Sequence, residues 1–246
     1  MKSYLKRNCK FTAVISVVAL FMVAGLGNIP SRAAEQGGHK AYVYTELQIS
    51  APFEKVPWQG INKAIKQQTG FKNKTWLSGA GNNSAGGFYV FDTLENAQKF
   101  VNDYFPKEAA KFGVAQTTRI FDAAATKEAS KGMKSVHYTT ATKKPGAFVY
   151  TEVQLSVLPF DKAPWRTQNP KLLQQKGLLT KTWLSGAHTG TIGGFYAFDT
   201  LENAKKFAIE VFPKTAEALK AAFYTRVFDA SQTEAASRDM NSPFYK

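Results

Sequence analysis

The sequence predicts an α+β fold in which two βαββαβ units follow one another along the chain. The first observation is a repeat: residues 75–80 return unchanged as residues 182–187, and residues 92–97 return as residues 199–204. The second is that each copy alternates strand-like and helix-like stretches in the same order. The copies are offset by 106 to 107 residues, far more than the roughly 50 residues of the longest solenoid units. This is the length of a domain that buries its own core, so the chain is a tandem duplication.

The first 33 residues predict a signal peptide. Basic residues precede an apolar run over residues 11–27, and Ser31 and Ala33 offer small side chains at the two positions that a signal peptidase inspects. We expect cleavage after Ala33 and a secreted or periplasmic mature chain. An uncleaved anchor is the alternative, but the run is short for a span of about 20 residues. No stable membrane anchor is expected after cleavage.

Composition excludes several function classes for the mature chain. The single cysteine, Cys9, precedes the apolar run, so disulfides and thiolate chemistry are not expected. The formal net charge of +14 includes five basic residues of the signal; without them 27 basic groups face 18 acidic groups, a net charge of +9. These charges are scattered rather than gathered in a stripe, so a nucleic-acid partner is not expected.

The first copy opens with a strand over residues 41–50. Val43, Thr45 and Leu47 alternate there with residues of the other face, which is the period of a strand. Residues 56–68 follow as a weak helix that ends at a glycine. In the second copy this region contains Pro170, which predicts a helix that is short or begins at that proline.

Two more strands follow, over residues 71–78 and 87–91, with a glycine-rich turn between them. Gly86 and Gly87 predict close backbone passage or a bulge at the start of the third strand. They do not form a phosphate loop, because no helix follows directly.

The second helix begins after a cap at Asp92 or Thr93, with Glu95 in its first turn. Five apolar residues then recur on one face, and Pro106 and its counterpart Pro213 bend or end the helix. Those five are Leu94, Ala97, Phe100, Val101 and Tyr104. Residues 117–122 form the fourth strand, and the polar residues 139–146 form a linker between the copies.

This element order is the ferredoxin-like plan, a four-stranded antiparallel sheet with both helices on one face. The units span residues 40–138 and 147–246. Each leaves one sheet face bare, and the two bare faces can cover each other. We therefore expect an intrachain pseudo-dimeric α+β barrel, packed sheet to sheet, in a chain that is itself monomeric.

Both copies resemble the YdhR-like monooxygenases, small dimeric α+β barrel proteins related to the antibiotic-biosynthesis monooxygenases. The resemblance covers residues 42–123 and 148–230. In the first copy it rests on Gly70-Phe71, Trp76, the segment 85–89 and Arg119-Ile120-Phe121-Asp122. In the second it rests on Trp183, Gly193-Gly194-Phe195-Tyr196 and Arg226-Val227-Phe228-Asp229.

The resemblance implies a cavity between sheet and helices, and oxygenation of a small aromatic or quinol-type substrate without a cofactor. Such chemistry needs a dry aromatic pocket, a base that ionises the substrate, and polar groups that hold the anion. The signal peptide and the fusion depart from the family unit, a cytosolic single copy that pairs with itself. The substrate is left open by these departures.

The candidate bases are Glu46 and Glu152, which lie within strands among uncharged residues. Burial of such carboxyl groups raises their pKa and suits them to accept protons. The alternative is a solvated glutamate, or one paired with a lysine or with Arg119. Thr45 and Thr151 belong to the opposite face. If the cavity lies on that face, the threonine is the polar contact and the glutamate faces the other copy.

The remaining candidates for substrate binding are aromatic or cationic and recur in both copies. The tryptophans could stack on a ligand or fill the core, where truncation to alanine costs about 3–5 kcal/mol. The arginines could hold a substrate anion or form salt bridges with nearby carboxylates. These candidates are Trp76, Phe88, Tyr89, Arg119, Trp183, Phe195, Tyr196 and Arg226.

The histidines argue against a metal or haem site. His137 aligns with Phe244 and His188 with Gly81, so neither recurs in the other copy. No cofactor is expected. Two other functions stay open beside the enzyme: a noncatalytic carrier of a small aromatic or apolar molecule, and a structural pseudo-dimer without an open pocket.

Overall fold

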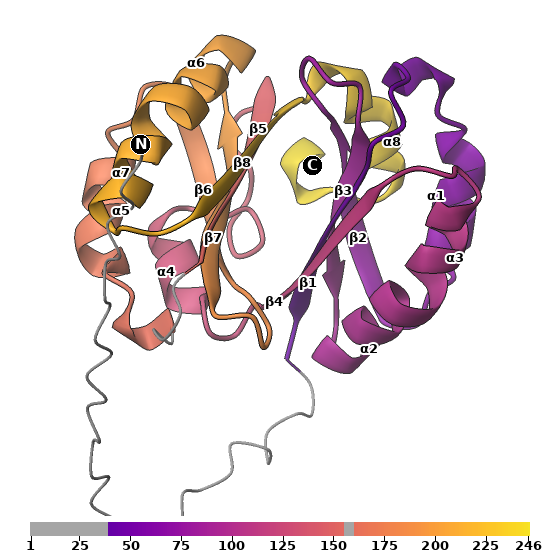
Figure 1. The fold of residues 1–246 in the computed structure, drawn as a ribbon, viewed down its shortest axis with the longest axis horizontal. Helices are drawn as coiled ribbons and strands as arrows, with labels where there is room; N and C mark the ends of the chain where they lie inside the picture. Colours follow the sequence, from indigo (N-terminus) through magenta and orange to yellow (C-terminus); the bar gives the residue numbers. More distant parts are fainter. Residues whose placement is uncertain (1–38, 155–159) are drawn as a thin grey trace, which may run out of the picture. The chain divides into compact units, whose positions relative to one another are not determined.

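The computed structural model describes residues 39–154 and 160–246. The predicted signal peptide, residues 1–33, lies outside the described residues. Both copies have the predicted βαββαβ order, and each folds into a four-stranded antiparallel sheet (Figure 1). The strand orders are β2-β3-β1-β4 and β6-β7-β5-β8. These are ferredoxin-like units, as the sequence predicts.

The elements correspond one to one between the copies. In the first copy they are β1 (Ala41–Leu47), α1 (Trp58–Lys66), β2 (Phe71–Ser78), β3 (Ala85–Phe91), α2 (Leu94–Lys99), α3 (Phe105–Ala110) and β4 (Gln116–Asp122). In the second they are β5 (Ala147–Gln154), α5 (Trp165–Leu172), β6 (Leu178–Ser185), β7 (Thr191–Phe198), α6 (Leu201–Lys206), α7 (Phe212–Ala218) and β8 (Phe223–Asp229).

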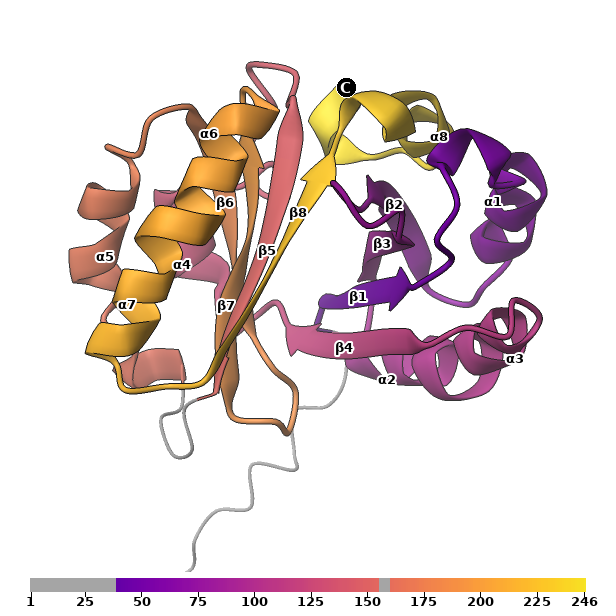
Figure 2. The same cartoon turned by 45° about the horizontal axis from the view of Figure 1, so that its top comes forward.

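One face of each sheet packs against the other copy. Tyr44 stacks on Tyr150 with ring centroids 4.1 Å apart, and Phe88 stacks on Phe195 at 4.4 Å. These rings belong to one buried cluster that draws residues from both sheets. The helices α2, α6 and α7 lie on the outer sides of their own sheets (Figure 2). The sheet-to-sheet pseudo-dimer is therefore confirmed.

Short β-bridges join the edges of the two sheets. Gly79 pairs with Phe228, and Phe121 pairs with Gly186. Each bridge is extended by one more backbone hydrogen bond, from Ala80 to Val227 and from Ala187 to Ile120. The barrel is thus closed by backbone contacts as well as by side chains, which leaves fewer free strand edges.

The second helix of each copy does not end at its proline. A π-helical turn (Phe100–Tyr104) links α2 to α3, and the helical run continues through Pro106 to Ala110. The longer turn accommodates a residue that lacks an amide hydrogen.

In the second copy, α5 starts at Trp165, five residues before Pro170, and is one residue shorter than α1. The proline therefore does not begin that helix.

Two helices that the sequence did not predict form exchanged tails, defined here as residues 127–138 and 231–246. They contain α4 (Lys127–Gly132) and α8 (Glu234–Asp239). Each tail packs on β2 or β6 of the other copy, where Ser237 Oγ accepts from Trp76 N and Ser130 Oγ accepts from Trp183 N, both at 2.9 Å. Each sheet edge is thus covered by the opposite copy.

No helix in the described parts of the chain is both long and apolar enough to cross a membrane.

Candidate active site

Each copy holds a cavity between its sheet and its own helices. The first measures about 150 Å³ and lies among β1, β2, β3, α1 and α3; its counterpart in the second copy measures about 170 Å³. In both cavities the sheet contributes the same four polar or aromatic side chains, which we call the floor of the cavity: a threonine, a lysine, a tryptophan and a tyrosine. They are Thr45, Lys74, Trp76 and Tyr89 in the first cavity, and Thr151, Lys181, Trp183 and Tyr196 in the second.

Strand pairing brings these side chains together. Lys74 on β2 lies opposite Tyr89 on β3, and Trp76 lies opposite Gly87, which is itself opposite Thr45 on β1. Since side chains alternate along a strand, Lys74 and Trp76 project from the same face. The same register recurs in the second copy.

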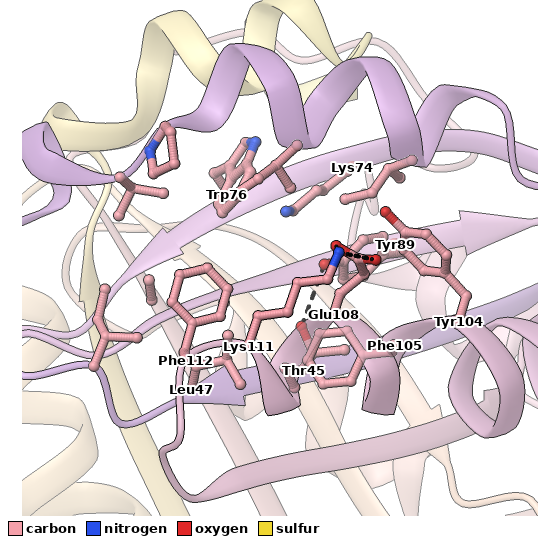
Figure 3. A pocket seen from close by; sticks show the side chains of 18 residues that line it. Thr45, Leu47, Lys74, Trp76, Tyr89, Tyr104, Phe105, Glu108, Lys111 and Phe112 are labelled. Carbon is pink, nitrogen blue, oxygen red and sulfur yellow. Dashed lines mark hydrogen bonds and ion pairs between the residues drawn. The ribbon is translucent and has the colours of Figure 1, made fainter.

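Lys74 is the unusual member of this site. It is 1% exposed, and its Nζ lies 2.8 Å from the centroid of the Trp76 ring and 4.9 Å from that of Tyr89 (Figure 3). Lys181 is placed alike, 2.9 Å from the Trp183 ring. Burial lowers the pKa of both lysines well below its usual value of 10.5. Burial therefore favours the neutral amine, which can accept a proton, over the ammonium form.

Gly87 makes the room that Lys74 occupies. A Cβ atom at this position would lie 2.4 Å from Lys74 Cε and 2.8 Å from the Tyr89 ring. Gly194 stands in the same relation to Lys181, with a Cβ at 2.6 Å from its Cε. The predicted close backbone passage is observed at Gly86, where a Cβ would lie 2.0 Å from the Thr45 carbonyl oxygen, whereas at Gly87 the close neighbour is the lysine side chain.

The tryptophan is oriented by an asparagine of its own copy, and this asparagine is in turn hydrogen-bonded to the other copy. Trp76 Nε1 donates to Asn62 Oδ1 at 2.8 Å, and Asn62 Nδ2 donates to the Ala236 carbonyl oxygen at 3.1 Å. The backbone amide of Lys74 also donates to the Met240 carbonyl at 3.1 Å. Ala236 and Met240 belong to the exchanged tail of the second copy. Each cavity is therefore supported from both copies.

The tail of the first copy supports the second cavity in the same way. Trp183 Nε1 donates to Asn169 Oδ1 at 2.8 Å, and Asn169 Nδ2 donates to the Ala129 carbonyl at 3.0 Å.

Two hydroxyl groups lie beside each lysine. Thr45 Oγ1 donates to the phenol oxygen of Tyr89 at 3.3 Å. In the second cavity Thr151 Oγ1 is buried and has no hydrogen bond of ordinary geometry among the described residues, although the Tyr196 phenol is close enough for the two hydroxyls to interact. Burial raises the pKa of Tyr89 and Tyr196, so both phenols stay protonated. A buried hydroxyl without a well-formed hydrogen bond is costly, and a polar ligand atom would relieve that cost.

The two glutamates proposed as bases do not line these cavities. Glu46, 1% exposed, lies between the sheets and accepts from Tyr44 at 2.7 Å and from Arg226 Nε at 3.0 Å. Burial opposes ionisation of Glu46, but hydrogen bonds from Arg226, Ser84 and Tyr44 outweigh it and lower its pKa. The pairing with arginine that the sequence left open is the one observed.

Glu152 repeats this arrangement, since Arg119 Nε donates to it at 3.2 Å. Each ion pair joins one copy to the other, so Arg119 and Arg226 serve the contact between the sheets. Phe88 and Phe195 also lie between the sheets rather than in the cavities. The first cavity therefore brings together Thr45, Trp76 and Tyr89, and the second cavity brings together their counterparts Thr151, Trp183 and Tyr196.

Sequence reasoning missed the two lysines. The signal was present, because Lys74 and Lys181 directly precede the repeated segments 75–80 and 182–187 and are themselves identical. A lysine in a strand is normally exposed to solvent, so its residue type alone does not indicate a buried site.

The described residues contain no cluster of three or more potential metal ligands. His137 is instead half-buried in the contact between the copies, with its Nε2 atom buried and its ring centroid 5.0 Å from that of Tyr42. Its burial lowers its pKa to about 3.

The arrangement fits proton abstraction from a weakly acidic aromatic molecule. Because its pKa is lowered, a larger fraction of the buried amine is neutral at a given pH than for a solvated lysine, and only the neutral form can accept a proton. The ammonium that forms lies over the Trp76 ring, which attracts a cation, and it can pair with the anion it has just created.

Comparison with known proteins supports the fold and the family resemblance. Residues 46–132 match the family described as "Putative mono-oxygenase ydhR", so the resemblance of the first copy to that family is confirmed. No curated protein matches the sequence.

Solved structures that match this chain include the following three, of which the first has a TM-score that supports a similar fold. An anthrone oxidase-like protein is 12% identical with a TM-score of 0.50, covering 78% of this chain and 91% of that chain. A putative monooxygenase from Lactobacillus acidophilus NCFM is 8% identical with a TM-score of 0.46, covering 77% and 93%. A ferredoxin fold protein from Listeria monocytogenes, related to antibiotic biosynthesis monooxygenases, is 10% identical with a TM-score of 0.46, covering 78% and 96%.

Proposed function

We propose that this monooxygenase-like chain oxygenates a small phenol or quinol-type substrate with dioxygen, and that Lys74 and Lys181 are the bases. The observation that carries the proposal is the buried lysine of each cavity, which contacts aromatic rings and is shielded from water. Burying an amine in this way costs stability. The cost is understandable if the amine is used in a reaction.

The first step is a proton transfer. The neutral amine of Lys74 takes the hydroxyl proton of the substrate and becomes an ammonium ion, which pairs with the phenolate. The Thr45 and Tyr89 hydroxyls are within the same wall of the cavity and can hydrogen-bond the anion. Exclusion of water strengthens these contacts.

Dioxygen is the oxidant and enters from solution. The phenolate donates two electrons to it, and a C–O bond forms at a ring carbon that carries negative charge. The lysine ammonium returns its proton to the resulting peroxide, and the hydroperoxide loses water to leave a quinone. One oxygen atom enters the product and the other leaves as water, so the step consumes phenol and O₂ in equal amounts.

The cavity sets the size of the substrate. A dry cavity of about 150 Å³, like the first cavity, accepts a molecule the size of benzene. A one-ring phenol therefore fits without rearrangement, and a three-ring substrate requires the walls to move.

Export is part of the proposal. Residues 1–33 have the features of a signal peptide, so we place the reaction in the periplasm or outside the cell. The substrate is then a molecule met or released there.

A noncatalytic carrier is the second candidate. The buried hydroxyl of Thr151, which lacks a hydrogen bond of ordinary geometry, supports binding of a polar ligand atom but does not require a reaction. The third possibility, a pseudo-dimer without a pocket, has no support, because each copy holds a cavity.

Oxygen consumption tests the enzyme directly. Purified chain without added flavin or metal is mixed with phenol, hydroquinone and anthrone, and O₂ uptake and quinone formation are followed together. The expected result is equal uptake and quinone formation, fastest with one-ring substrates. Mass spectrometry of ligands retained by the protein serves as the second measurement. Retained phenols without any O₂ uptake would favour the carrier. If no phenol is retained and no O₂ is consumed, both the enzyme and the carrier hypotheses would be contradicted.

A further inference from the structure

The two cavities share their floors but differ at their mouths. In the first cavity the exposed lining residues Lys111 and Phe112 mark the end that opens to solvent. Lys111 Nζ forms hydrogen bonds of 2.8 and 2.9 Å with both carboxylate oxygens of Glu108, one turn earlier on the same helical run. Figure 3 shows this ion pair among the residues that line the first cavity. The mouth of the first cavity is therefore charged.

The corresponding mouth in the second cavity is neutral. Glu108 aligns with Thr215, Lys111 with Ala218, and Phe112 with Leu219. These three replacements line the second cavity. Since the two helical runs have the same geometry, with a π-helical turn before each, the difference lies in the side chains and not in the backbone.

We infer that the two cavities bind different phenols: the first selects a ring with a polar group at the end remote from the lysine, and the second selects a ring with an alkyl group there. This inference rests on the proposed function for the orientation of the ligand, with its acidic hydroxyl at Lys74 or Lys181. The remote substituent then points to the mouth in each case.

The chemistry of each mouth supports this assignment. A hydroxyl at the mouth of the first cavity can donate to Glu108 and accept from Lys111, whereas an alkyl group there removes water from both charges without replacing its hydrogen bonds. At the second mouth an alkyl group covers Ala218 and Leu219, which are apolar and exposed. The Thr215 hydroxyl can keep its water.

Matched ligands separate the two preferences. The probes are 4-(2-hydroxyethyl)phenol and 4-propylphenol, which have similar shapes and differ by a hydroxyl in place of a methyl group. Binding is followed by fluorescence in two single-tryptophan reporters, in both of which Trp58 and Trp165 are replaced by Phe. The first reporter also carries Trp183→Phe and reports the first cavity through Trp76, and the second carries Trp76→Phe and reports the second cavity through Trp183. Because the exposed ion pair is partly solvated, we expect the first cavity to favour the hydroxyl probe by about fivefold to tenfold relative to the second.

The control is to exchange the side chains that line the two mouths. In the first reporter, Glu108→Thr with Lys111→Ala should shift the preference toward 4-propylphenol. In the second, Thr215→Glu with Ala218→Lys should shift it toward the hydroxyl probe. These positions are exposed or half-buried on helices, so folding is expected to be kept. Calorimetric titration of the unsubstituted chain gives a second measurement that needs no tryptophan replacement, with two classes of site expected for each probe.

The outcomes are distinguishable. Equal preferences in both cavities, or preferences that the exchange leaves unchanged, would overturn the inference and leave the oxygenase proposal standing. Opposite preferences without O₂ uptake would support the inference for a carrier and remove the catalytic proposal. Absence of phenol binding in both reporters would overturn both.

Discussion

The Nζ atom of Lys74 lies 2.8 Å from the centroid of the Trp76 ring, in a site where its side chain is almost fully buried. Lys181 and Trp183 repeat the contact at 2.9 Å. Desolvation is what lowers the pKa of both lysines. A cation over a tryptophan ring is attracted to it, yet this attraction does not offset full burial, so the amine loses its proton easily. The predictions below follow from this pairing and from the contacts around it.

Replacement of both lysines by methionine should abolish oxygenation. Met fills a similar volume without a basic group, and loss of a general base typically lowers the rate by about 10²- to 10⁴-fold. The measurement is O₂ uptake with phenol for Lys74→Met, Lys181→Met and the double variant. Lys72→Met is the matched control, because Lys72 lies on the same strand but is exposed. A double variant that retains the original rate would exclude the lysines as bases.

The same lysines should make stability depend on alkaline pH. In the unfolded chain their pKa is near 10.5, whereas burial lowers it in the folded chain. Between the two values the unfolded chain binds more protons, so the free energy of unfolding rises with pH. Lys74→Met should therefore be more stable at pH 7, by about 1–3 kcal/mol, with a gap that narrows toward pH 10.5.

Denaturant unfolding at pH 7, 8, 9 and 10 measures this gap. A difference that stays constant over the range would mean that the folded-state lysine is not deprotonated early.

Removing the charges of the two glutamates should weaken the contact between the copies and spare the reaction. Glu46→Gln with Glu152→Gln leaves Arg226 and Arg119 without their ion pairs. We expect the free energy of unfolding to fall by about 1–3 kcal/mol, with O₂ uptake per folded molecule unchanged. Loss of uptake in a fully folded variant would return the glutamates to the mechanism.

The lowered pKa of Glu46 also predicts that the free energy of unfolding falls at acid pH. Its pKa is lowered in the folded chain below the usual 4.5, so its contribution is present above that value and is lost as pH falls through the folded-state pKa. The unsubstituted chain should lose more stability than Glu46→Gln between pH 5 and the acid limit, as circular dichroism during acid titration would reveal.

Gly87→Ala should displace Lys74. The added Cβ would approach Lys74 Cε to 2.4 Å and the Tyr89 ring to 2.8 Å, and overpacking of this kind costs about 1–3 kcal/mol. Gly60→Ala is the control, because a Cβ there meets nothing within 4 Å on an exposed position of α1. It should raise stability by about 0.4–1 kcal/mol. If Gly87→Ala were as stable as the control, the close passage would be refuted.

Ser237→Ala should affect the cavity of the opposite copy. Its hydroxyl accepts from the Trp76 amide at 2.9 Å, and leaving that buried amide unpaired costs about 1–3 kcal/mol. The emission of Trp76 should change while that of Trp183 does not, and Ser130→Ala should do the reverse. The comparison is made in the two single-tryptophan reporters, which also lack Trp58 and Trp165. If Ser237→Ala changed the emission of Trp183, the tryptophan of its own copy, and not that of Trp76, the exchange of tails would be contradicted.

The fold was predictable because local pattern and repeat agree. The alternation of Val43, Thr45 and Leu47 defined the strand and its two faces, and the second copy repeated the evidence. The exchanged tails were not predictable, since residues 127–138 and 231–246 belong to similar copies whose sheet edges are also similar. A duplicated sequence offers each tail two nearly equivalent surfaces, and only the three-dimensional path of the chain decides between them.

The site was predictable in part for a related reason. Trp76, Tyr89 and Thr45 recur in both copies and share a strand face or a cross-strand neighbour, so their grouping follows from β-sheet geometry. The role of Glu46 depended on which sheet face met the other copy, and the strand pattern alone left that open. Lys74 was hidden because its charge suggests exposure, although its neighbour Trp76 indicates the inner face.

Because the two copies are joined in one chain, every substitution occurs once. In a homodimer, a substitution that improves one site is also present in the other, and so is any loss of stability that it causes. Here Glu108 and its counterpart Thr215 differ within one chain. Covalent fusion thus lets natural selection change one cavity of the barrel without changing the other.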